Sequence, residues 1–162
     1  MTVITLTTDF GLADGYVGIM KGVILGIAPT AQCVDLTHEI APQDVRRAAL
    51  VIAQASPYFP KGTIHLVVVD PGVGSERRPL IVQTPQACFV GPDNGLFTDA
   101  LDAPTTISYA ADRPQFWLPE ISSTFHGRDI FAPLAAHLAL GVAPETLGSP
   151  IRDAILLPRP MP

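Results

Sequence analysis

The chain has 162 residues, of which 48% are hydrophobic and 15% charged, and its formal net charge is −5. This composition is typical of one globular domain with its own core and excludes a disordered chain. The acidic balance and the lack of a dense Lys/Arg run exclude a nucleic-acid or anionic-membrane partner of the usual basic kind. Two cysteines without close spacing, Cys33 and Cys88, favour a reducing compartment, and we expect the cytoplasm. We expect no signal peptide and no membrane span, because no apolar run approaches roughly 18 residues.

The first half of the chain alternates strand and helix signals. Apolar residues recur at helical spacing from residue 16 until Pro29, and Pro42 suits the first turn of a second helix. The run TIHLVVVD is almost continuously apolar, which is typical of a strand covered on both faces. We predict strands over 3–9, 31–38 and 63–70, and helices over 16–29 and 41–59. This alternation predicts an α/β fold, a three-layer sandwich with a largely parallel central sheet flanked by helices.

The second half of the chain predicts shorter elements. Two strands are close enough to form a hairpin, and a last long helix ends at Gly141. We predict strands over 79–85, 88–93 and 105–110, and helices over 94–102 and 128–141. The last five residues contain three prolines. We therefore interpret residues 1–150 as one α/β domain and 151–162 as a Pro-rich linker.

Polar residues follow the strands at the ends where open α/β sheets bind ligands. Asp9, His38 and Asp70 end the three strands of the first half. Other polar residues lie in the loops nearby: Asp14, Arg77, Arg78, Asp93, Asn94, His126, Arg128 and Asp129. Loops that meet at one rim in this way form small-molecule sites.

Several of these residues also have a purely structural interpretation. Asp9 can cap the turn into the first helix, and Asp70 can accept backbone N–H groups in its own turn. His126 can be satisfied by the backbone, and the Asp-Asn-Gly sequence at 93–95 is a strong turn signal. We interpret as structural the remaining histidines and both cysteines: His38, His65, His137, Cys33 and Cys88.

The sequence lacks the motifs of several common chemistries. It contains no G-x-G-x-x-G, P-loop, G-x-S-x-G, H-E-x-x-H or Cys/His ligand set. What remains is an Asp, an Arg and a His on separate loops, a set that suits activation of a water molecule. A metal-dependent hydrolase with Asp9, Asp14, Asp70 and His126 as ligands is an alternative, although no paired-ligand motif supports it.

Four segments in order resemble a known family: TTDFG, VDPGVGSERRPL, GPDNGLFT and TFHGRDIFAPLAAHLA. Together they resemble the S-adenosyl-L-methionine hydroxide adenosyltransferases, or SAM hydrolases, which are relatives of the fluorinases and chlorinases. The resemblance runs from residue 3 to about residue 152. It implies hydrolysis of S-adenosyl-L-methionine to adenosine and L-methionine, without a cofactor or metal, by in-line attack of water on ribose C5′.

The resemblance also implies roles for individual residues. The catalytic, water-holding set falls on Asp70, Arg77 and His126. The substrate contacts fall on Asp9 for the ribose, Asp14 and Asn94 for the methionine end, and Phe125 and Gly127 beside the reacting carbon. Halogenating relatives place a neutral aromatic residue at the position of Asp70, whose charge would repel a halide, so water is the expected nucleophile here.

Family members also carry a β-rich C-terminal domain that supplies the adenine pocket, and they form trimers with active sites at the subunit interfaces. The resemblance therefore implies a homotrimer in which residues 1–150 contribute the N-terminal half of each site. An inactive oligomerising or binding domain of the same fold is the alternative.

Overall fold

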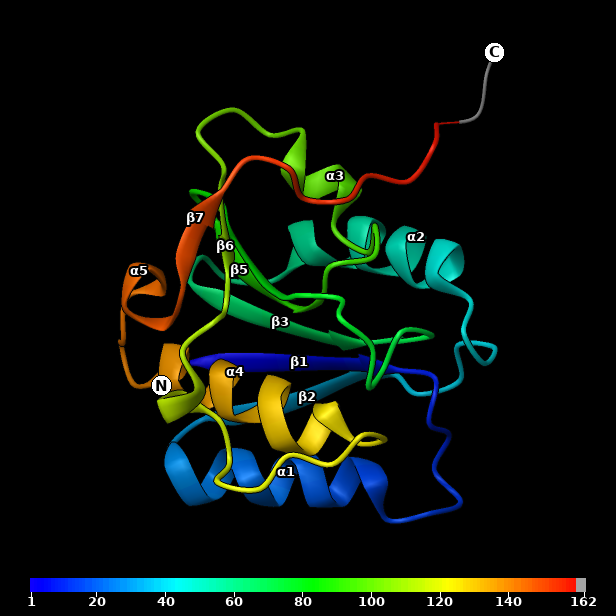
Figure 1. Cartoon of the computed structure of the whole chain (residues 1–162), viewed down its shortest axis with the longest axis vertical. Coiled ribbons are helices and arrows are strands. Elements are labelled where there is room, and N and C mark those ends of the chain that lie inside the picture. The colour runs from blue at the N-terminus through cyan, green and yellow to red at the C-terminus, as the bar shows by residue number, and fades with distance from the viewer. Residues whose placement is uncertain (160–162) are drawn as a thin grey trace.

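In the computed structural model, which describes residues 1–159, a seven-stranded sheet has the order β2-β1-β3-β5-β4-β6-β7 (Figure 1). Neighbouring strands among β2, β1, β3 and β5 are parallel, whereas β4, β6 and β7 are joined antiparallel. The predicted hairpin is confirmed, because Ile81 of β4 lies opposite Val90 of β5. The strands are β1 Val3–Thr8, β2 Gln32–Thr37, β3 Thr63–Val68, β4 Pro79–Gln83, β5 Ala87–Pro92, β6 Ile107–Ala110 and β7 Ser149–Ile151.

Helices cover both faces of the sheet, as predicted, with α1 and α4 on one face and α2 and α3 on the other (Figure 1). Successive residues of β3 point to opposite faces, so Leu66 and Val68 pack under α1 and α4, whereas Val67 packs under α2. The helices are α1 Tyr16–Ile27, α2 Val45–Ala55, α3 Thr98–Leu101, α4 Ala132–Ala139 and α5 Pro144–Leu147, with 3₁₀ turns η1 Ser56–Tyr58 and η2 Pro114–Phe116 and a π-helix η3 Gly127–Phe131. Within residues 1–159 no helix has the length and apolar character needed to cross a bilayer.

Two predicted helix boundaries are wrong for local reasons. The helix expected from residue 41 begins at Val45, because Asp44 accepts the backbone N–H of Arg47 at 2.9 Å and caps it there. Gln43, just before this cap, has a φ of 66°, which a helical residue cannot adopt. The helix expected over 94–102 is only Thr98–Leu101, since Gly95 has a φ of 98°.

Three features near the end of the domain were not predicted. The helix expected over 128–141 begins as the π-helix η3 and continues as α4. The four-residue helix α5 and the three-residue strand β7 follow it. Elements of this length contain too few residues for a hydrophobic period to be recognised.

The described part of the predicted linker, residues 152–159, lies against the domain. The backbone N–H of Ile155 donates to Asp93 at 2.8 Å, and that of Leu157 donates to Thr98 at 2.9 Å. Residues 160–162 of this prediction lie outside the described residues. The division into a domain over 1–150 and a linker over 151–162 stays a prediction.

Candidate active site

The buried strand β3 delivers a carboxylate to the edge of the sheet. All six of its residues are buried, and Asp70 lies two residues beyond its end. A tight turn then brings Arg77 back onto Asp70. Arg77 donates from Nε to Oδ1 of Asp70 at 2.8 Å and from Nη2 to Oδ2, so the guanidinium holds the carboxylate by two parallel bonds. The two side chains are 10% and 6% exposed, which makes this a largely desolvated ion pair.

The turn between Asp70 and Arg77 depends on a glycine. Gly74 has a φ of 79°, and a Cβ built on it would lie 2.4 Å from the carbonyl oxygen of Ser123. A glycine is therefore required for the loop after β3 to approach the loop before η3. This close approach brings the two loops of the site together.

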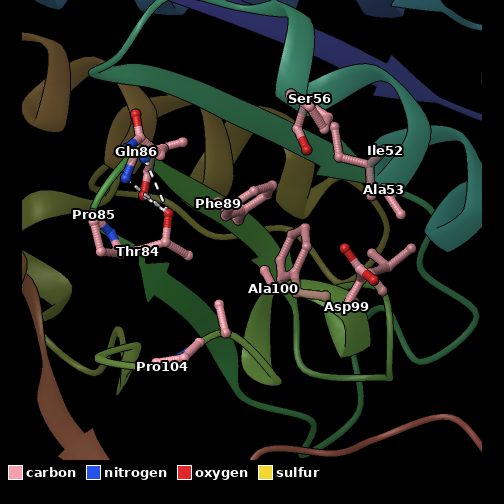
Figure 2. A pocket seen from close by; sticks show the side chains of 15 residues that line it. Ile52, Ala53, Ser56, Thr84, Pro85, Gln86, Phe89, Asp99, Ala100 and Pro104 are labelled. Carbon is pink, nitrogen blue, oxygen red and sulfur yellow. Dashed lines mark hydrogen bonds between the residues drawn. The ribbon is translucent and has the colours of Figure 1, made fainter.

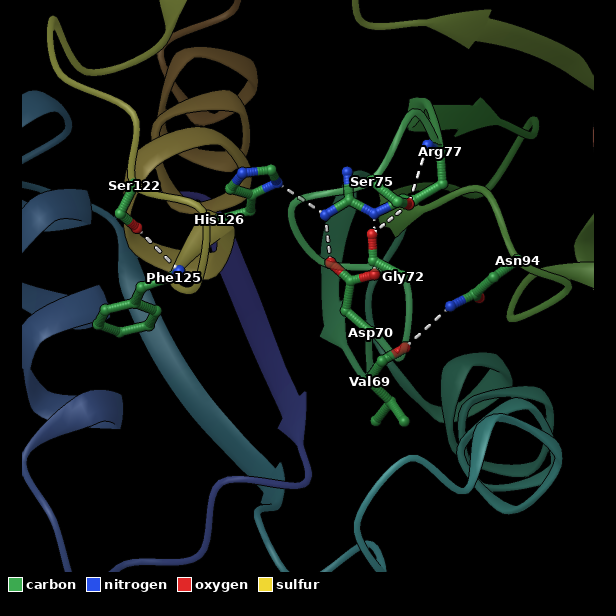
Figure 3. A network of polar contacts seen from close by, with 9 residues as sticks. All are labelled: Val69, Asp70, Gly72, Ser75, Arg77, Asn94, Ser122, Phe125 and His126. Atoms are coloured by element: carbon green, nitrogen blue, oxygen red, sulfur yellow. Dashed lines mark hydrogen bonds and ion pairs between the residues drawn. The ribbon is translucent and has the colours of Figure 1, made fainter.

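His126 reaches the same ion pair from the opposite loop (Figure 3). Its Nδ1 lies 2.8 Å from Nη2 of Arg77, and 49 residues separate the two in sequence. A guanidinium can only donate, so Nδ1 accepts and the neutral imidazole carries its proton on Nε2. Burial, and then the charge of Arg77, lower the pKa of His126 below its ordinary value. His126 is consequently a neutral Nε2–H donor near pH 7.

Arg78, the neighbour of Arg77, belongs to a different network. It donates to Asp93 at 2.9 Å and to Asp153 at 2.9 Å. Asp93 is 2% exposed and also accepts from Ile155. Arg78 therefore ties the segment after β7 to the turn after β5, and Arg77 alone of the two contacts Asp70 among the described residues.

The loop after β1 lies next to that after β3, because Thr8 is paired with Val68. Asp9 follows Thr8 and accepts the backbone N–H of Gln43 at 2.7 Å, so it braces the segment before α2 rather than capping the first helix. Asp14 is exposed in the turn before α1. Both predicted substrate carboxylates thus lie on the loop beside Asp70.

Asn94 contacts the residue that precedes Asp70. Its Nδ2 donates to the carbonyl of Val69 at 3.0 Å (Figure 3). Its Oδ1 is buried and has no hydrogen-bond partner among the described residues. A buried acceptor without a partner is costly, so the turn at Asn94 carries an unmet hydrogen bond.

Phe125 and Gly127 flank His126. The Phe125 ring, 9% exposed, packs edge-on against Phe10 and Tyr16 with centroids 5.8 and 5.2 Å away. A cavity of about 390 Å³ lies beside this aromatic cluster. Gly127 opens η3, and a Cβ there would lie 3.3 Å from the sulfur of Met20, so a larger residue would crowd this corner.

Two buried residues lie next to the site: Asp129, which the sequence placed among the polar residues of the rim, and Phe131, which it did not identify. Asp129 accepts the backbone N–H of Ser122 at 2.8 Å and anchors the loop that carries His126. Phe131 lies under Arg77, with the guanidinium carbon 5.1 Å from the ring centroid. Both belong to the π-helix η3, which has no sequence signature that we could have used.

Another pocket, of about 380 Å³, lies between α2, α3 and the turn joining β4 to β5 (Figure 2). Phe89 and Phe97 line it, and Asp99 is the one charged group among its described lining residues. None of the eight predicted site residues lines this pocket. Among its described lining residues it therefore lacks the combination of Asp, Arg and His that suits activation of water.

The alternative of a metal-dependent hydrolase finds no ligand cluster in the described residues. Within residues 1–159 no three His, Cys, Asp or Glu side chains gather as a metal site would require. Nδ1 of His126, the one acceptor of the neutral ring, also faces the Arg77 guanidinium and not a cation.

Comparisons with known proteins identify the family and the fold. Residues 4–148 match the family model described as the SAM hydroxide adenosyltransferase N-terminal domain. A (R)-S-adenosyl-L-methionine hydrolase of Salinispora tropica is 47% identical over 98% of the chain and 61% of its own length, so the chain spans about three fifths of this relative. A fluorinase of an Actinoplanes species is 26% identical over 93% of the chain and 59% of its length. The crystal structure of an uncharacterized conserved protein from Thermotoga maritima superimposes with a TM-score of 0.94 at 40% identity, covering 98% of this chain and 62% of that one.

Proposed function

Because the chain belongs to the S-adenosyl-L-methionine hydroxide adenosyltransferase family through its N-terminal domain, we propose that it carries the water-activating half of a site that hydrolyses S-adenosyl-L-methionine to adenosine and L-methionine. The observation that carries the proposal is the buried contact among Asp70, Arg77 and His126. The name of the Salinispora relative supports the same substrate.

The three side chains divide the task of holding the water. Each carboxylate oxygen has two lone pairs, so Asp70 can accept a proton from water while both its oxygens bind Arg77. His126 accepts from Arg77 through Nδ1 and so fixes the guanidinium that holds Asp70. Arg77 fixes both partners in one plane and keeps Asp70 in position.

The reaction balances without a further reagent. The water oxygen forms a bond to C5′ while the C5′–S bond breaks. The electron pair of the broken bond stays on sulfur and turns the sulfonium into a neutral thioether. The attacking oxygen becomes strongly acidic as its bond forms and transfers a proton to Asp70. Correct placement of a reactant in this way can lower a barrier by up to about 7–11 kcal/mol in ideal cases.

The acidic loop after β1 suits the positive charges of the substrate. In this proposal, as the resemblance implies, Asp9 accepts from the ribose hydroxyls, and Asp14 and Asn94 contact the methionine end. Phe125 and Gly127 shape the wall beside the reacting carbon.

The proposal needs no metal or cofactor, because a sulfonium leaves as a neutral thioether and needs no protonation or Lewis acid. Turnover should therefore be indifferent to a chelator. Loss of adenosine release on adding EDTA, and its recovery with a divalent metal, would instead support the metal-dependent hydrolase.

From the resemblance we also propose a cytoplasmic homotrimer whose adenine pocket comes from a C-terminal β domain. The free thiols of Cys33 and Cys88 fit a reducing compartment. The trimer is checked by light scattering of the purified protein.

The decisive experiment is incubation of the chain, together with the proposed C-terminal β domain, with S-adenosyl-L-methionine in oxygen-18 water, followed by mass spectrometry. Adenosine that contains one oxygen-18 atom, with unlabelled methionine, supports attack of water at C5′. A chain that oligomerises but releases no adenosine, and gives no heat on titration with S-adenosyl-L-methionine or adenosine, is the inactive binding domain instead.

A further inference from the structure

Arg77 has a third contact besides its two hydrogen-bonding partners. Its donors lie at the edge of the planar guanidinium, and they bind Asp70 and His126. The guanidinium carbon of the same group lies over the ring of Phe131, 5.1 Å from the centroid. Phe131 is fully buried, so this contact forms away from water, where attraction between a cation and an aromatic face is strongest.

The π-helix η3 explains why His126 and Phe131 reach the same side chain. His126 directly precedes η3, and Phe131 is its last residue. In an α-helix of 3.6 residues per turn, residues five apart point in directions about 140° apart. The wider π turn instead forms hydrogen bonds between residues five apart, as Ala132 does with Gly127, and brings such residues towards one side.

We propose that Phe131, presented by this π turn, is a positioning residue that holds the guanidinium of Arg77 where it binds Asp70 and His126 together. The inference rests on the proposed function for its purpose, because it concerns the site that would hold the water. An arginine side chain has many rotamers, and a packed aromatic ring lowers the entropy lost when the hydrogen bonds to Asp70 and His126 select one of them.

A purely structural role is the competing explanation, since Phe131 also belongs to the core between the sheet and α4. Phe97 offers a matched control. It is an equally buried phenylalanine, 2% exposed, but it belongs to the core on the other face of the sheet. Replacement of either ring by leucine removes similar volume, whereas only Phe131 lies against Arg77.

The test compares Phe131→Leu with Phe97→Leu by ¹⁵N–¹H NMR of the arginine Nε–H signals in the intact chain. We expect hydrogen exchange at Nε of Arg77 to accelerate about tenfold in Phe131→Leu, as loss of a desolvated cation–π contact implies, and to stay at the wild-type rate in Phe97→Leu. Equal rates in all three proteins, or equal acceleration in both variants, overturn the inference. If Phe131→Leu does not fold, Phe131→Met supplies the same test with a more adaptable side chain.

This measurement separates the inference from the proposed function, because it needs no turnover. In protein that releases adenosine, Phe131→Leu should lower kcat with KM unchanged, while Phe97→Leu should change neither. A lack of adenosine release with the expected exchange rates would reject the hydrolysis but leave the positioning of Arg77 in place.

Discussion

Replacing Asp70 by asparagine removes one charge from the desolvated ion pair and keeps the shape of the side chain. Arg77 would remain charged and 10% exposed, opposite a neutral amide. Removing one partner of a buried pair costs about 3–5 kcal/mol. Asparagine still accepts one bond, and the contacts of Arg77 to His126 and Phe131 persist. We therefore expect the free energy of unfolding to fall by about 3 kcal/mol, the lower end of this range.

The assay is urea unfolding at pH 7, followed by far-ultraviolet circular dichroism. Asp153→Asn is the matched control, because Asp153 also pairs with an arginine but its side chain is 78% exposed. An exposed pair contributes about 0–1 kcal/mol, so the control should unfold almost as the wild type does. In a domain of this size, a loss of 3 kcal/mol corresponds to a fall in Tm of about 6–12 °C.

The same variant tests the chemistry, since the amide cannot take the proton of the attacking water. Adenosine release should fall to the background of the assay in Asp70→Asn and in His126→Ala, and stay unchanged in Asp153→Asn. Near wild-type turnover in either site variant would remove the mechanism. Equal, small stability losses in Asp70→Asn and Asp153→Asn would show that the pair at the site is not desolvated.

Three further predictions concern the site and its support. Arg77→Lys keeps the charge but cannot bind both partners with a planar fork, so adenosine release measured by chromatography should fall at least about tenfold. Burial lowers the pKa of His65 to about 4 in the folded chain. The free energy of unfolding should therefore be at its full value above about pH 6.5 and fall by about 3 kcal/mol as the pH approaches 4. His65→Gln should flatten this pH dependence in urea titrations, and the same pH dependence in the variant and the wild type would contradict the prediction. Gly74→Ala should lower the Tm more than Gly141→Ala does. Both glycines have a positive φ, but only at Gly74 would the new Cβ meet a backbone atom. An equal fall in Tm in the two variants would refute the clash.

The layered α/β fold was predictable because its signals are local. The apolar run of β3 shows that both faces are covered, and the turn residues around Asn94 mark the end of the hairpin. The position of Asp70 at the carboxyl end of a central strand, where ligands bind, then follows from the topology of parallel sheets. The resemblance added the pairing of this residue with Arg77.

Other features depend on contacts that no local window contains. The start of α2 was misplaced because a cap at Asp44 competes with the proline signal at Pro42. The π turn of η3 was missed because its residues are those of an ordinary helix.

Short-range patterns of apolar, turn and capping residues are sufficient to place β3, the hairpin and the polar loops, since the energies that select these elements act within a few residues. The tautomer of His126, the desolvation of Asp70 and the plane of Arg77 arise only when loops 49 residues apart meet. Their cause is the exclusion of water between the two loops, which strengthens each charge interaction and which no isolated segment can achieve.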